Sequence, residues 1–489
     1  MKPNRLFGLA AVGLCLLSGA AAHAQEPLAA SYAAVQGIKI DFTPSPRTPH
    51  YRFELREKGG ETLLCAKEFD SLPGRTDVFL PFDAALPGAQ YTLSVTALPQ
   101  TERAGLDAAA TKERDFSLPT VCGHTLAQGG FLYGDGSEGN PYLVASPAQL
   151  QHISHADHRG KGQYFRQTRD IDLLDPAFYQ DGAPYDADAD PSNGNWLPIA
   201  PAHNWNNTFI GHYDGGGHAV RNISYISSIS SNQDAGIFGI VSRNSSIHDL
   251  GVENFHFEGL GAGGIVGAAS GWTTGMTTRF YRCYALNGYA KGANAGGCFG
   301  YLHSDTGNLQ IEDCYCAGFT GEVVYSNGYN DAGGIASEIS ANHSGENWVR
   351  GCYAIPVSLT ASNTSARHGL GGIVGTVVHP SYVSYPSYAD FVDVQGNYYL
   401  AGSAPYGVGY PASDSGAAPI SSSSFGEQST FSGWDFEGTW TMGSITYTDA
   451  SGAERTIAAP VLRAFQGGRD YAAAQGAGER AALTLGFSE

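Results

Sequence analysis

The stretch Gly263-Gly264-Ile265-Val266-Gly267 recurs in altered form along this chain. The other copies are Ala235-Gly236-Ile237-Phe238-Gly239, Gly296-Gly297-Cys298-Phe299-Gly300, Gly333-Gly334-Ile335-Ala336-Ser337 and Gly371-Gly372-Ile373-Val374-Gly375. Successive copies start roughly 28 to 38 residues apart, a period that indicates stacked structural repeats. Because the spacing varies, we expect coils whose loops differ in length on one side of the stack.

A second element lies between these blocks. It reads Arg282-Cys283-Tyr284-Ala285, Asp313-Cys314-Tyr315-Cys316 and Gly351-Cys352-Tyr353-Ala354, with Asn397-Tyr398-Tyr399 as a degenerate last copy. Each coil would pair short strands with the coils above and below it, at about 4.8 Å per step. Inward Ile, Val, Phe and Cys side chains would form ladders, and the flanking glycines would allow tight corners and left-handed φ values. The matching cysteines favour a buried ladder over a zinc site.

A further series precedes the repeats and identifies a resemblance. It comprises Asp170-Ile171-Asp172-Leu173, Trp196-Leu197-Pro198-Ile199 and the run from Phe209 to Val220. Together with the glycine blocks, this series resembles the GLUG motif over roughly residues 130–465. The resemblance implies a right-handed parallel β-helix, or solenoid. GLUG repeats occur in bacterial surface proteins and beside the peptidase domain of some IgA-cleaving enzymes, but the motif itself brings no catalytic site.

The region before the repeats has a different pattern. Apolar and polar residues alternate in Tyr51-Arg52-Phe53-Glu54-Leu55 and again from Tyr91 to Ala97, which predicts half-buried strands. The run from Leu86 to Val95 resembles the tyrosine corner of fibronectin type III domains and implies a small β-sandwich. Cys65 and Cys122 lie in or just after this region, and we expect them to form a disulfide.

The first residues are typical of a secretory signal peptide. Lys2 and Arg5 supply positive charge, residues 6–17 are apolar, and Ala22-His23-Ala24 is a small-x-small cleavage site. Cleavage is favoured over a lipid anchor at Cys15, because a large residue precedes that cysteine. No later segment has enough consecutive apolar residues for a membrane helix.

The predicted fold class is therefore all-β, with a solenoid preceded by a small sandwich domain. The predicted segments are a signal peptide (1–24), a fibronectin III- or Ig-like β-sandwich (25–122), a GLUG-type solenoid (123–465) and a C-terminal tail (466–489). The 65 glycines and the 15% of charged residues agree with many short strands joined by turns rather than with amphipathic helices.

The net charge of −19 excludes some partners. Nucleic acid needs a basic face, so it is not expected as a ligand. An acidic polysaccharide is also disfavoured unless calcium bridges the two molecules. These observations leave an extracellular glycan or a host or cell-surface protein as the expected partner.

Three histidines, His152, His155 and His158, recur at every third residue after a predicted helix start. That spacing can gather metal ligands on one helix face. A solvated or half-packed helix face is favoured here, because no carboxylate partner lies in register. The His-Glu-x-x-His motif of metallopeptidases is absent from the sequence.

Asp186, Asp188 and Asp190 alternate along an acidic loop, as oxygen ligands do in calcium loops. Pro191 stands where an EF-hand loop needs glycine, and no glutamate closes the site. A solvated acidic insertion is the alternative interpretation. No cofactor is required by the predicted function, and calcium is the one candidate.

Enzymatic activity is the main alternative to binding, because β-helices host polysaccharide lyases and glycosidases. Hydrolysis needs two carboxylates roughly 5–10 Å apart, and acids are sparse in the repeats. Asp234 and Asp331 each precede a glycine block, so they would stack on one face, where repetition favours a role in a turn. We expect no enzymatic activity.

The predicted function is adhesin-like binding of glycan or protein by a protein that is exported to the cell surface, outer membrane or periplasm. Tyr382, Tyr385 and Tyr388 recur at every third residue in a proline-containing segment and would project from one side of an extended path. They are the predicted ligand-binding residues, with anchoring of the loop on the solenoid wall as the alternative. A purely structural stalk is the third possibility.

Overall fold

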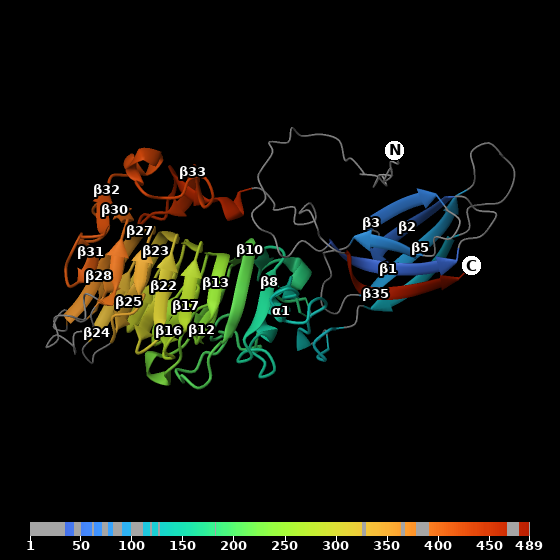
Figure 1. Cartoon of the computed structure of the whole chain (residues 1–489), viewed down its shortest axis with the longest axis horizontal. Helices are drawn as coiled ribbons and strands as arrows, with labels where there is room; N and C mark the ends of the chain where they lie inside the picture. The colour runs from blue at the N-terminus through green and yellow to red at the C-terminus, as the bar shows by residue number, and fades with distance from the viewer. Residues whose placement is uncertain are drawn as a thin grey trace, which may run out of the picture.

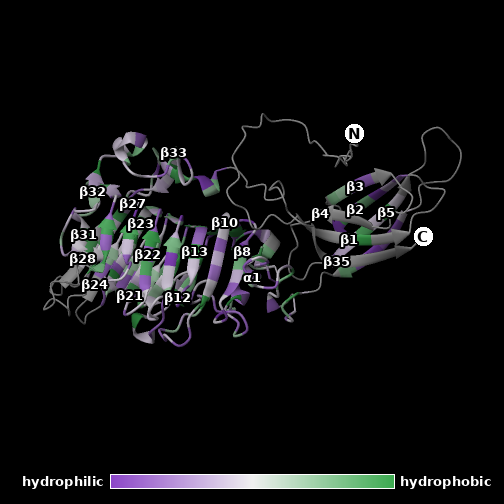
Figure 2. Ribbon diagram, in the orientation of Figure 1, coloured by the Kyte–Doolittle hydropathy of each residue, from purple (hydrophilic) through white to green (hydrophobic). Residues whose placement is uncertain are grey.

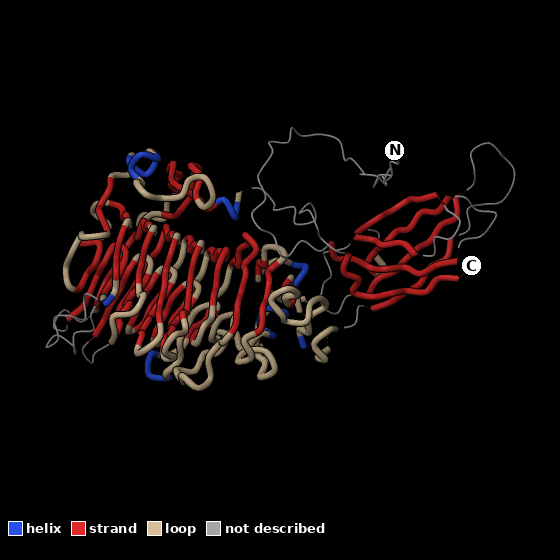
Figure 3. Tube along the Cα trace, in the orientation of Figure 1, coloured by secondary structure: helices blue, strands red, loops and turns tan. Residues whose placement is uncertain are grey.

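Strands are the main secondary structure of the described residues, joined by loops and a few short helices (Figure 3). The computed structural model describes residues 35–43, 50–60, 63–70, 77–81, 90–98, 111–117, 120–125, 128–180, 182–324, 329–362, 367–377, 391–466 and 479–488. The predicted all-β class is confirmed. The predicted signal peptide, residues 1–24, lies outside the described residues.

The N-terminal strands form two small sheets (Figure 1). One sheet has the order β35-β1-β4 and the other the order β3-β2-β5-β6. Their bounds are β1 Val35–Thr43, β2 His50–Glu57, β3 Leu63–Asp70, β4 Asp77–Pro81, β5 Gln90–Leu98, β6 Thr111–Ser117 and β35 Glu479–Ser488. Within the segment predicted as a C-terminal tail, β35 pairs in parallel with β1, so the end of the chain returns to the N-terminal sheet.

The predicted repeats form a stack of parallel strands. The first sheet of the stack contains β7 Tyr142–Val144, β8 Gln163–Gln167, β9 Ile171–Asp172, β10 Gly211–Arg221, β11 Ser224–Ile226, β13 Ser246–Glu253, β14 His256–Glu258, β17 Thr277–Tyr281, β18 Tyr284–Leu286, β19 Tyr289–Gly292, β22 Asn308–Glu312, β23 Tyr315–Val323, β26 Trp348–Arg350, β27 Tyr353–Ala361, β29 Asp393–Gln395, β30 Asn397–Leu400 and β32 Ala417–Ile420. Each strand pairs in parallel with the equivalent strand of the next repeat, as β13 does with β10 and β17.

The glycine blocks build a second, nine-stranded sheet. Its strands are β12 Phe238–Ser242, β15 Gly261–Gly263, β16 Val266–Gly271, β20 Asn294–Gly296, β21 Phe299–Ser304, β24 Tyr329–Gly333, β25 Ala336–Ala341, β28 Arg367–Thr376 and β31 Tyr406–Tyr410. Hydrophobic and hydrophilic residues interleave along the parallel strands (Figure 2). This pattern is expected where one side of a strand faces the core and the other faces outward.

The remaining elements lie at the edges of the stack. They are α1 Pro147–His152, the 3-10 turns η2 Pro176–Phe178, η3 Ile229–Ser231, η6 Ser424–Gly426, η7 Gln428–Thr430 and η8 Arg463–Phe465, and the antiparallel hairpin β33 Trp440–Thr448 with β34 Glu454–Leu462. Ser146 and Pro147 are the N-cap and first residue that the sequence predicts for a helix here, and α1 begins there: the side chain of Ser146 accepts a hydrogen bond from Gln149 N, and Pro147 occupies the first turn. It ends at His152, so His155 and His158 lie in the turns that follow.

Equivalent residues of successive repeats form ladders in the core. One ladder runs Phe238, Val266, Phe299, Ala336, Val374, each member paired with the next and fully buried. A second ladder runs Ile247, Phe280, Ile311, Val349. Because each rung packs on the equivalent apolar residue of the next repeat, the core is continuous along the stack.

The glycines of the blocks are required by close approach of the backbone. A Cβ on Gly296 would lie 1.7 Å from the carbonyl oxygen of Phe299, and one on Gly371 would lie 1.8 Å from that of Val374. Neither glycine is among the residues with positive φ. The expectation of left-handed φ values in these blocks is therefore wrong, and the corner demands glycine because a side chain would overlap the backbone three residues on.

The predicted cysteine ladder is confirmed. Cys283, Cys314 and Cys352 are free thiols with no exposed surface, and the amide N of Cys314 donates to Cys352 Sγ at 3.4 Å. The tyrosines that follow them stack on the other side of the strands, with ring centroids 5.1 Å apart from Tyr284 to Tyr315 and from Tyr315 to Tyr353.

The C-terminal hairpin covers this tyrosine ladder. The hydroxyl of Tyr353 donates to the carbonyl of Pro460 at 2.8 Å, and the indole nitrogen of Trp440 donates to Asp313 at 3.1 Å. Trp440 is fully buried within a hydrophobic cluster that includes Phe425 and Phe431. The hairpin therefore gives the stack a second hydrophobic layer.

We expect the stack to depend on each rung of the ladder. Leu302 is fully buried on β21 between Ala269 and Ile339, so Leu302→Ala should lower the free energy of unfolding by about 2–5 kcal/mol. The matched control is Leu174→Ala, because Leu174 is 48% exposed and its loss should change stability by no more than about 0.5 kcal/mol. Guanidinium denaturation measures both variants, and equal losses would contradict the ladder model.

Candidate ligand-binding site

An aromatic cavity of about 300 Å³ opens beside the nine-stranded sheet. We call it the aromatic pocket and define it by the five aromatic side chains that line it, His203, Trp205, Trp272, Tyr301 and His303. Asp234 and Asp305 supply carboxylates at its wall. A concave site with aromatic walls and a few polar groups is the usual form of a small-ligand site.

Three parts of the chain bring these rings together. Tyr301 and His303 lie on β21, on either side of the buried Leu302, so strand alternation turns both of them outward. Trp272 begins the loop between β16 and β17, and its carbonyl accepts a hydrogen bond from the hydroxyl of Thr306 at 2.6 Å. Trp205 lies in a turn before β10.

The rings form a contiguous surface. The centroid of Trp205 lies 4.9 Å from that of His203, 5.6 Å from that of Trp272 and 6.5 Å from that of Tyr301. Tyr301 and His303 are nearly parallel, with 10° between their planes. Trp272 is 42% exposed, and its ring is continuous with the other aromatic side chains of the pocket. A flat apolar ligand would therefore meet several rings at once.

A partly buried histidine–carboxylate pair supports the wall of the pocket. Asp234 has no exposed surface, and its Oδ2 lies 2.7 Å from His203 Nδ1 while its Oδ1 accepts the amide N–H of Gly261 at 3.0 Å. Burial alone would lower the pKa of His203, but its hydrogen bond to Asp234 and the negative charge of that carboxylate raise the pKa above its usual value. This pair fixes the His203 ring at the pocket wall.

The second carboxylate orients His303. The Nε2 of that ring lies 3.1 Å from Asp305 Oδ1, which also accepts from the amide of Asn342 at 2.9 Å. The Nδ1 of His303 lies 2.9 Å from the hydroxyl of Ser340. Both ring nitrogens thus have partners, which fix the orientation of the ring.

Asp234 and Asp331 do occupy matching places in the stack. The residue that follows each of them belongs to one ladder, in which Ala235, Ala262, Ala295 and Ala332 align. Asp331 accepts the amide of Gly369 at 2.8 Å, as Asp234 accepts that of Gly261. Each carboxylate thus binds the backbone of the next repeat, and because Asp331 lies on β24, the turn role expected for the two aspartates stays a prediction.

A second cavity, of about 780 Å³, shares Trp272 with the aromatic pocket. Its lining includes Tyr164 and His212, whose rings stack with centroids 4.2 Å apart, and the polar residues Lys161 and Arg243. Trp272 therefore stands between two hollows on the same side of the stack. An elongated ligand would contact both.

The predicted calcium ligands do not converge. The Oδ1 of Asp186 accepts the amide N–H of Asp188 and of Ala189, and the Oδ1 of Asp190 accepts the amide and hydroxyl of Ser192. Asp188 accepts the side chain of Asn193 at 3.0 Å. Within the described residues, this loop is not among the groups whose ligand atoms all lie within 4.8 Å of one another. Each carboxylate closes its own turn, and calcium binding stays a prediction.

The structure does not form the predicted disulfide. Cys65 and Cys122 are both free thiols. Cys65 lies on β3, whereas Cys122 lies against the histidines near α1 and accepts a hydrogen bond from the amide of Phe131 at 3.3 Å. The two cysteines thus belong to separate parts of the structure. Of the other predicted site residues, Tyr382, Tyr385 and Tyr388 lie outside the described residues and stay a prediction.

Sequence reasoning missed the aromatic pocket. Trp205 and Trp272 stand in loops some 67 residues apart, so no local motif links them. The available signal was their position: each is a large apolar residue among polar loop residues, in Asn204-Trp205-Asn206-Asn207 and Gly271-Trp272-Thr273-Thr274. A tryptophan in such a loop indicates a ligand surface when a rigid scaffold holds the loop.

Among the helices that the structure describes, none has both the length and the apolar character to span a lipid bilayer.

No family model matches the chain. Two curated proteins are similar to part of it. One, named "Putative Gly-rich membrane protein", from Evansella cellulosilytica, is 29% identical over 146 residues, which is 30% of this chain and 15% of the relative. The other, Halomucin from Haloquadratum walsbyi, is 27% identical over 215 residues, 43% of this chain and 2% of the relative.

The chain thus spans a small fraction of the curated relatives that it matches, and both are named as membrane or surface-type proteins. A similar solved structure is described as a "putative immunoglobulin A1 protease" from Bacteroides ovatus. It is 16% identical, with a TM-score of 0.40, and the match covers 69% of this chain and 97% of that one.

We expect the His203–Asp234 pair to make stability depend on pH. The pKa of His203 is raised in the folded state, so the pair stabilises the fold fully below the unfolded pKa of about 6.5 and loses this contribution as pH rises through the folded pKa. His203→Gln should therefore lower the melting temperature more near pH 6, where the histidine is protonated, than near pH 9, where it is neutral. His256→Gln, a histidine on β14 with 44% of its side chain exposed, is the control. A His203→Gln deficit that is equal at both pH values would contradict the prediction.

Proposed function

We propose that this chain is an exported, non-catalytic surface or periplasmic protein with adhesin-like function, and that it binds an extracellular glycan at the aromatic pocket. The observation that carries the proposal is the contiguous surface of Trp205, Trp272 and Tyr301 beside the Asp305 carboxylate, whose side chain is 40% exposed. Aromatic faces stack on the apolar faces of sugar rings, and carboxylates accept hydrogen bonds from sugar hydroxyls.

The position of Trp272 favours a chain of sugars over a single one. This ring is 42% exposed and lines both cavities, so successive sugar units would contact it from either side. The net charge of −19 disfavours a polyanionic glycan, because like charges repel. A neutral polysaccharide or oligosaccharide fits these features, and a protein ligand that inserts an apolar side chain is the other outcome of a binding screen.

The scaffold that we propose is a right-handed parallel β-helix of the GLUG type, preceded by a small β-sandwich. Parallel pairing between equivalent strands of successive repeats supports the β-helix. The two N-terminal sheets, with the orders β35-β1-β4 and β3-β2-β5-β6, support the sandwich. A rigid stack of this kind would hold loop tryptophans at fixed spacing.

The proposed location rests on two observations. The first residues have the pattern of a secretory signal, and the curated relatives carry the names of a membrane protein and a mucin-like protein. Surface exposure also suits a ligand site built from loops on one side of a stack. Membrane anchoring is not needed for the binding that we propose.

We expect the aromatic pocket to carry most of the binding energy. Trp272→Ala and Trp205→Ala should each weaken glycan binding at least about tenfold, the loss typical of a central aromatic contact, with little change in melting temperature. A glycan array followed by calorimetry with the selected glycan measures this. The control is Tyr406→Ala, because Tyr406 is 44% exposed on β31 and does not line the pocket.

Two outcomes would contradict the proposal. The first is unchanged binding of the selected glycan by both tryptophan variants. The second is an equal loss of binding in Tyr406→Ala, which would place the ligand elsewhere on the surface. A large fall in the melting temperature of Trp272→Ala would instead assign the exposed ring a structural role.

One observation favours a second candidate, a polysaccharide-active enzyme. Asp331 and Glu338 are both buried, and burial, followed by the nearby charge of Asp331, raises the pKa of Glu338 well above its usual value. A protonated carboxylic acid near a carboxylate is the arrangement that glycoside hydrolysis uses. Glu338 pairs in register with Tyr301 of the pocket, so the acids lie one repeat further along the stack.

We expect this pair to be structural, because both side chains are buried and Glu338 accepts a hydrogen bond from Ser340 at 2.8 Å. A screen of polysaccharides for release of new reducing ends should therefore give the same background for the wild type and for Glu338→Gln. Release by the wild type that disappears in Glu338→Gln would instead establish the enzyme.

A further inference from the structure

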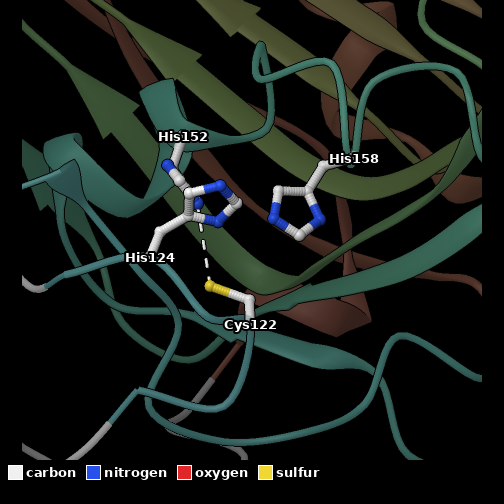
Figure 4. A group of neighbouring side chains, drawn as sticks. All are labelled: Cys122, His124, His152 and His158. Carbon is white, nitrogen blue, oxygen red and sulfur yellow. Dashed lines mark hydrogen bonds between the residues drawn. The ribbon is translucent and has the colours of Figure 1, made fainter.

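Four side chains with the chemistry of metal ligands meet near α1 (Figure 4). We call them the Cys-His cluster, and they are Cys122, His124, His152 and His158. Each offers one ligand atom, and these four atoms all lie within 4.8 Å of one another. Cys122 Sγ lies 3.7 Å from His152 Nε2.

Two segments of the chain supply the cluster. Cys122 and His124 belong to the segment that precedes the stack, where the amide of Val121 donates to the carbonyl of Phe131 at 2.8 Å. His152 is the last residue of α1, and His158 follows in a chain of turns in which the amides of His155 and His158 each donate three residues back. The cluster thus joins two segments that the chain sequence separates.

Two ring nitrogens in the cluster have no hydrogen-bond partner although they are buried. They are His124 Nδ1 and His158 Nε2. His158 as a whole is only 2% exposed, so bulk solvent does not reach that ring. An unpartnered buried polar atom costs about 1–3 kcal/mol, and such atoms are rare in folded proteins. A cation bound between the rings would satisfy both nitrogens.

Outer partners orient the ligands. The Nδ1 of His158 donates to Gln163 Oε1 at 2.9 Å, which leaves the lone pair of Nε2 available. The Nε2 of His124 lies 3.5 Å from a carboxylate oxygen of Asp157. The amide of Phe131 donates to the sulfur of Cys122 at 3.3 Å. Carboxylate, amide and backbone partners of this kind accompany metal-binding histidines and thiolates.

The separate acidic group elsewhere in the described residues differs in this respect. Asp214, His248 and Asp249 also have ligand spacing, but Arg282 donates to both oxygens of Asp249, at 2.8 and 2.7 Å. The Arg282 guanidinium therefore occupies the position that a metal ion would take beside Asp249. In the Cys-His cluster, by contrast, none of the four ligand residues is an arginine or a lysine.

From this geometry we infer that the Cys-His cluster is a structural zinc site. Thiolate and imidazole are both zinc ligands, and four protein ligands fill a tetrahedral site and leave no open position, as in structural zinc sites. With Zn–N near 2.0–2.1 Å and Zn–S near 2.3 Å, the ligand atoms of a tetrahedral site lie about 3.3–3.6 Å apart. The ligand atoms therefore need to close by no more than about 1.5 Å from their present limit of 4.8 Å.

Zinc here would fasten the segment before the stack onto its first turn. Phe131 stacks on Tyr142 with ring centroids 4.7 Å apart and packs edge-on against His158 at 5.1 Å. The cluster therefore lies against the hydrophobic end of the stack. The cluster shares no residue with the aromatic pocket. Failure of zinc binding and failure of glycan binding can therefore be distinguished by measuring each one separately.

The first test uses the full chain purified in reduced form. We expect about one zinc ion per chain by mass spectrometry of the metal content, and re-uptake of zinc by the chelator-treated protein in calorimetry. Cobalt added in place of zinc should give the charge-transfer absorption of a cysteine–cobalt bond. A wild-type chain that takes up no more zinc than Cys122→Ser would overturn the inference.

Matched variants assign the ligands. Cys122→Ser and His158→Ala should each weaken zinc binding at least about 100-fold, and Cys122→Ser should abolish the cobalt–sulfur absorption. Cys65→Ser and His256→Ala are the controls, because neither residue belongs to the cluster. Equal losses in the controls would overturn the site.

A variant outside the ligand set covers the case in which the ligand variants do not fold. Gln163→Leu removes the partner of His158 Nδ1 but leaves all four ligands in place. We expect zinc binding to weaken by about 10–100-fold with the circular dichroism spectrum unchanged. Unchanged zinc affinity in Gln163→Leu would overturn the assignment of His158 as an oriented ligand.

Discussion

The steric corner at each glycine block is the constraint on which the rest of the stack depends. At Gly296 and Gly371 a Cβ would lie less than 2 Å from the carbonyl oxygen three residues on, so the chain can turn there only without a side chain. The corner places the next residues, such as Phe299 and Val374, on the core side of the nine-stranded sheet. Repetition of the corner keeps the ladders in register from one repeat to the next.

The register of the ladders then determines where ligand chemistry is available. On β21 the buried Leu302 fixes the orientation of Tyr301 and His303, which turn outward together. Loops leave the stack between paired strands, so their length can vary without disturbing the core. Trp205 and Trp272 come from two such loops and meet because the strands beneath them are stacked. The binding surface is thus a consequence of stacking and not of any single segment.

The tyrosine-bearing side of the stack and its first turn are covered by different elements. The tyrosine ladder of Tyr284, Tyr315 and Tyr353 is covered by the C-terminal hairpin, whose Trp440 reaches back to Asp313. At the first turn, α1 and Phe131 close the hydrophobic end, and the Cys-His cluster lies against them. Unpaired strand edges at the end of a stack would otherwise invite association with other chains.

The sequence by itself determined the repeat architecture. The glycine blocks, the Cys-Tyr element and the start of α1 at Ser146 are local patterns, and each has a local physical cause. Sequence reasoning assigned the wrong cause to the block glycines, because backbone overlap depends on atoms that only a folded corner brings together. It also paired Cys65 with Cys122, because both lie in or just after the N-terminal region. The structure places them in separate parts of the fold.

The tertiary structure alone decided the two candidate sites. The spacing of His152, His155 and His158 predicted a plain helix face, because nothing in that segment reveals Cys122 and His124 arriving from an earlier one. Trp205 and Trp272 were likewise isolated residues until stacking set their rings 5.6 Å apart. Repeats are encoded by short-range patterns, whereas sites form between segments far apart in sequence, and their distances follow only from the packed fold.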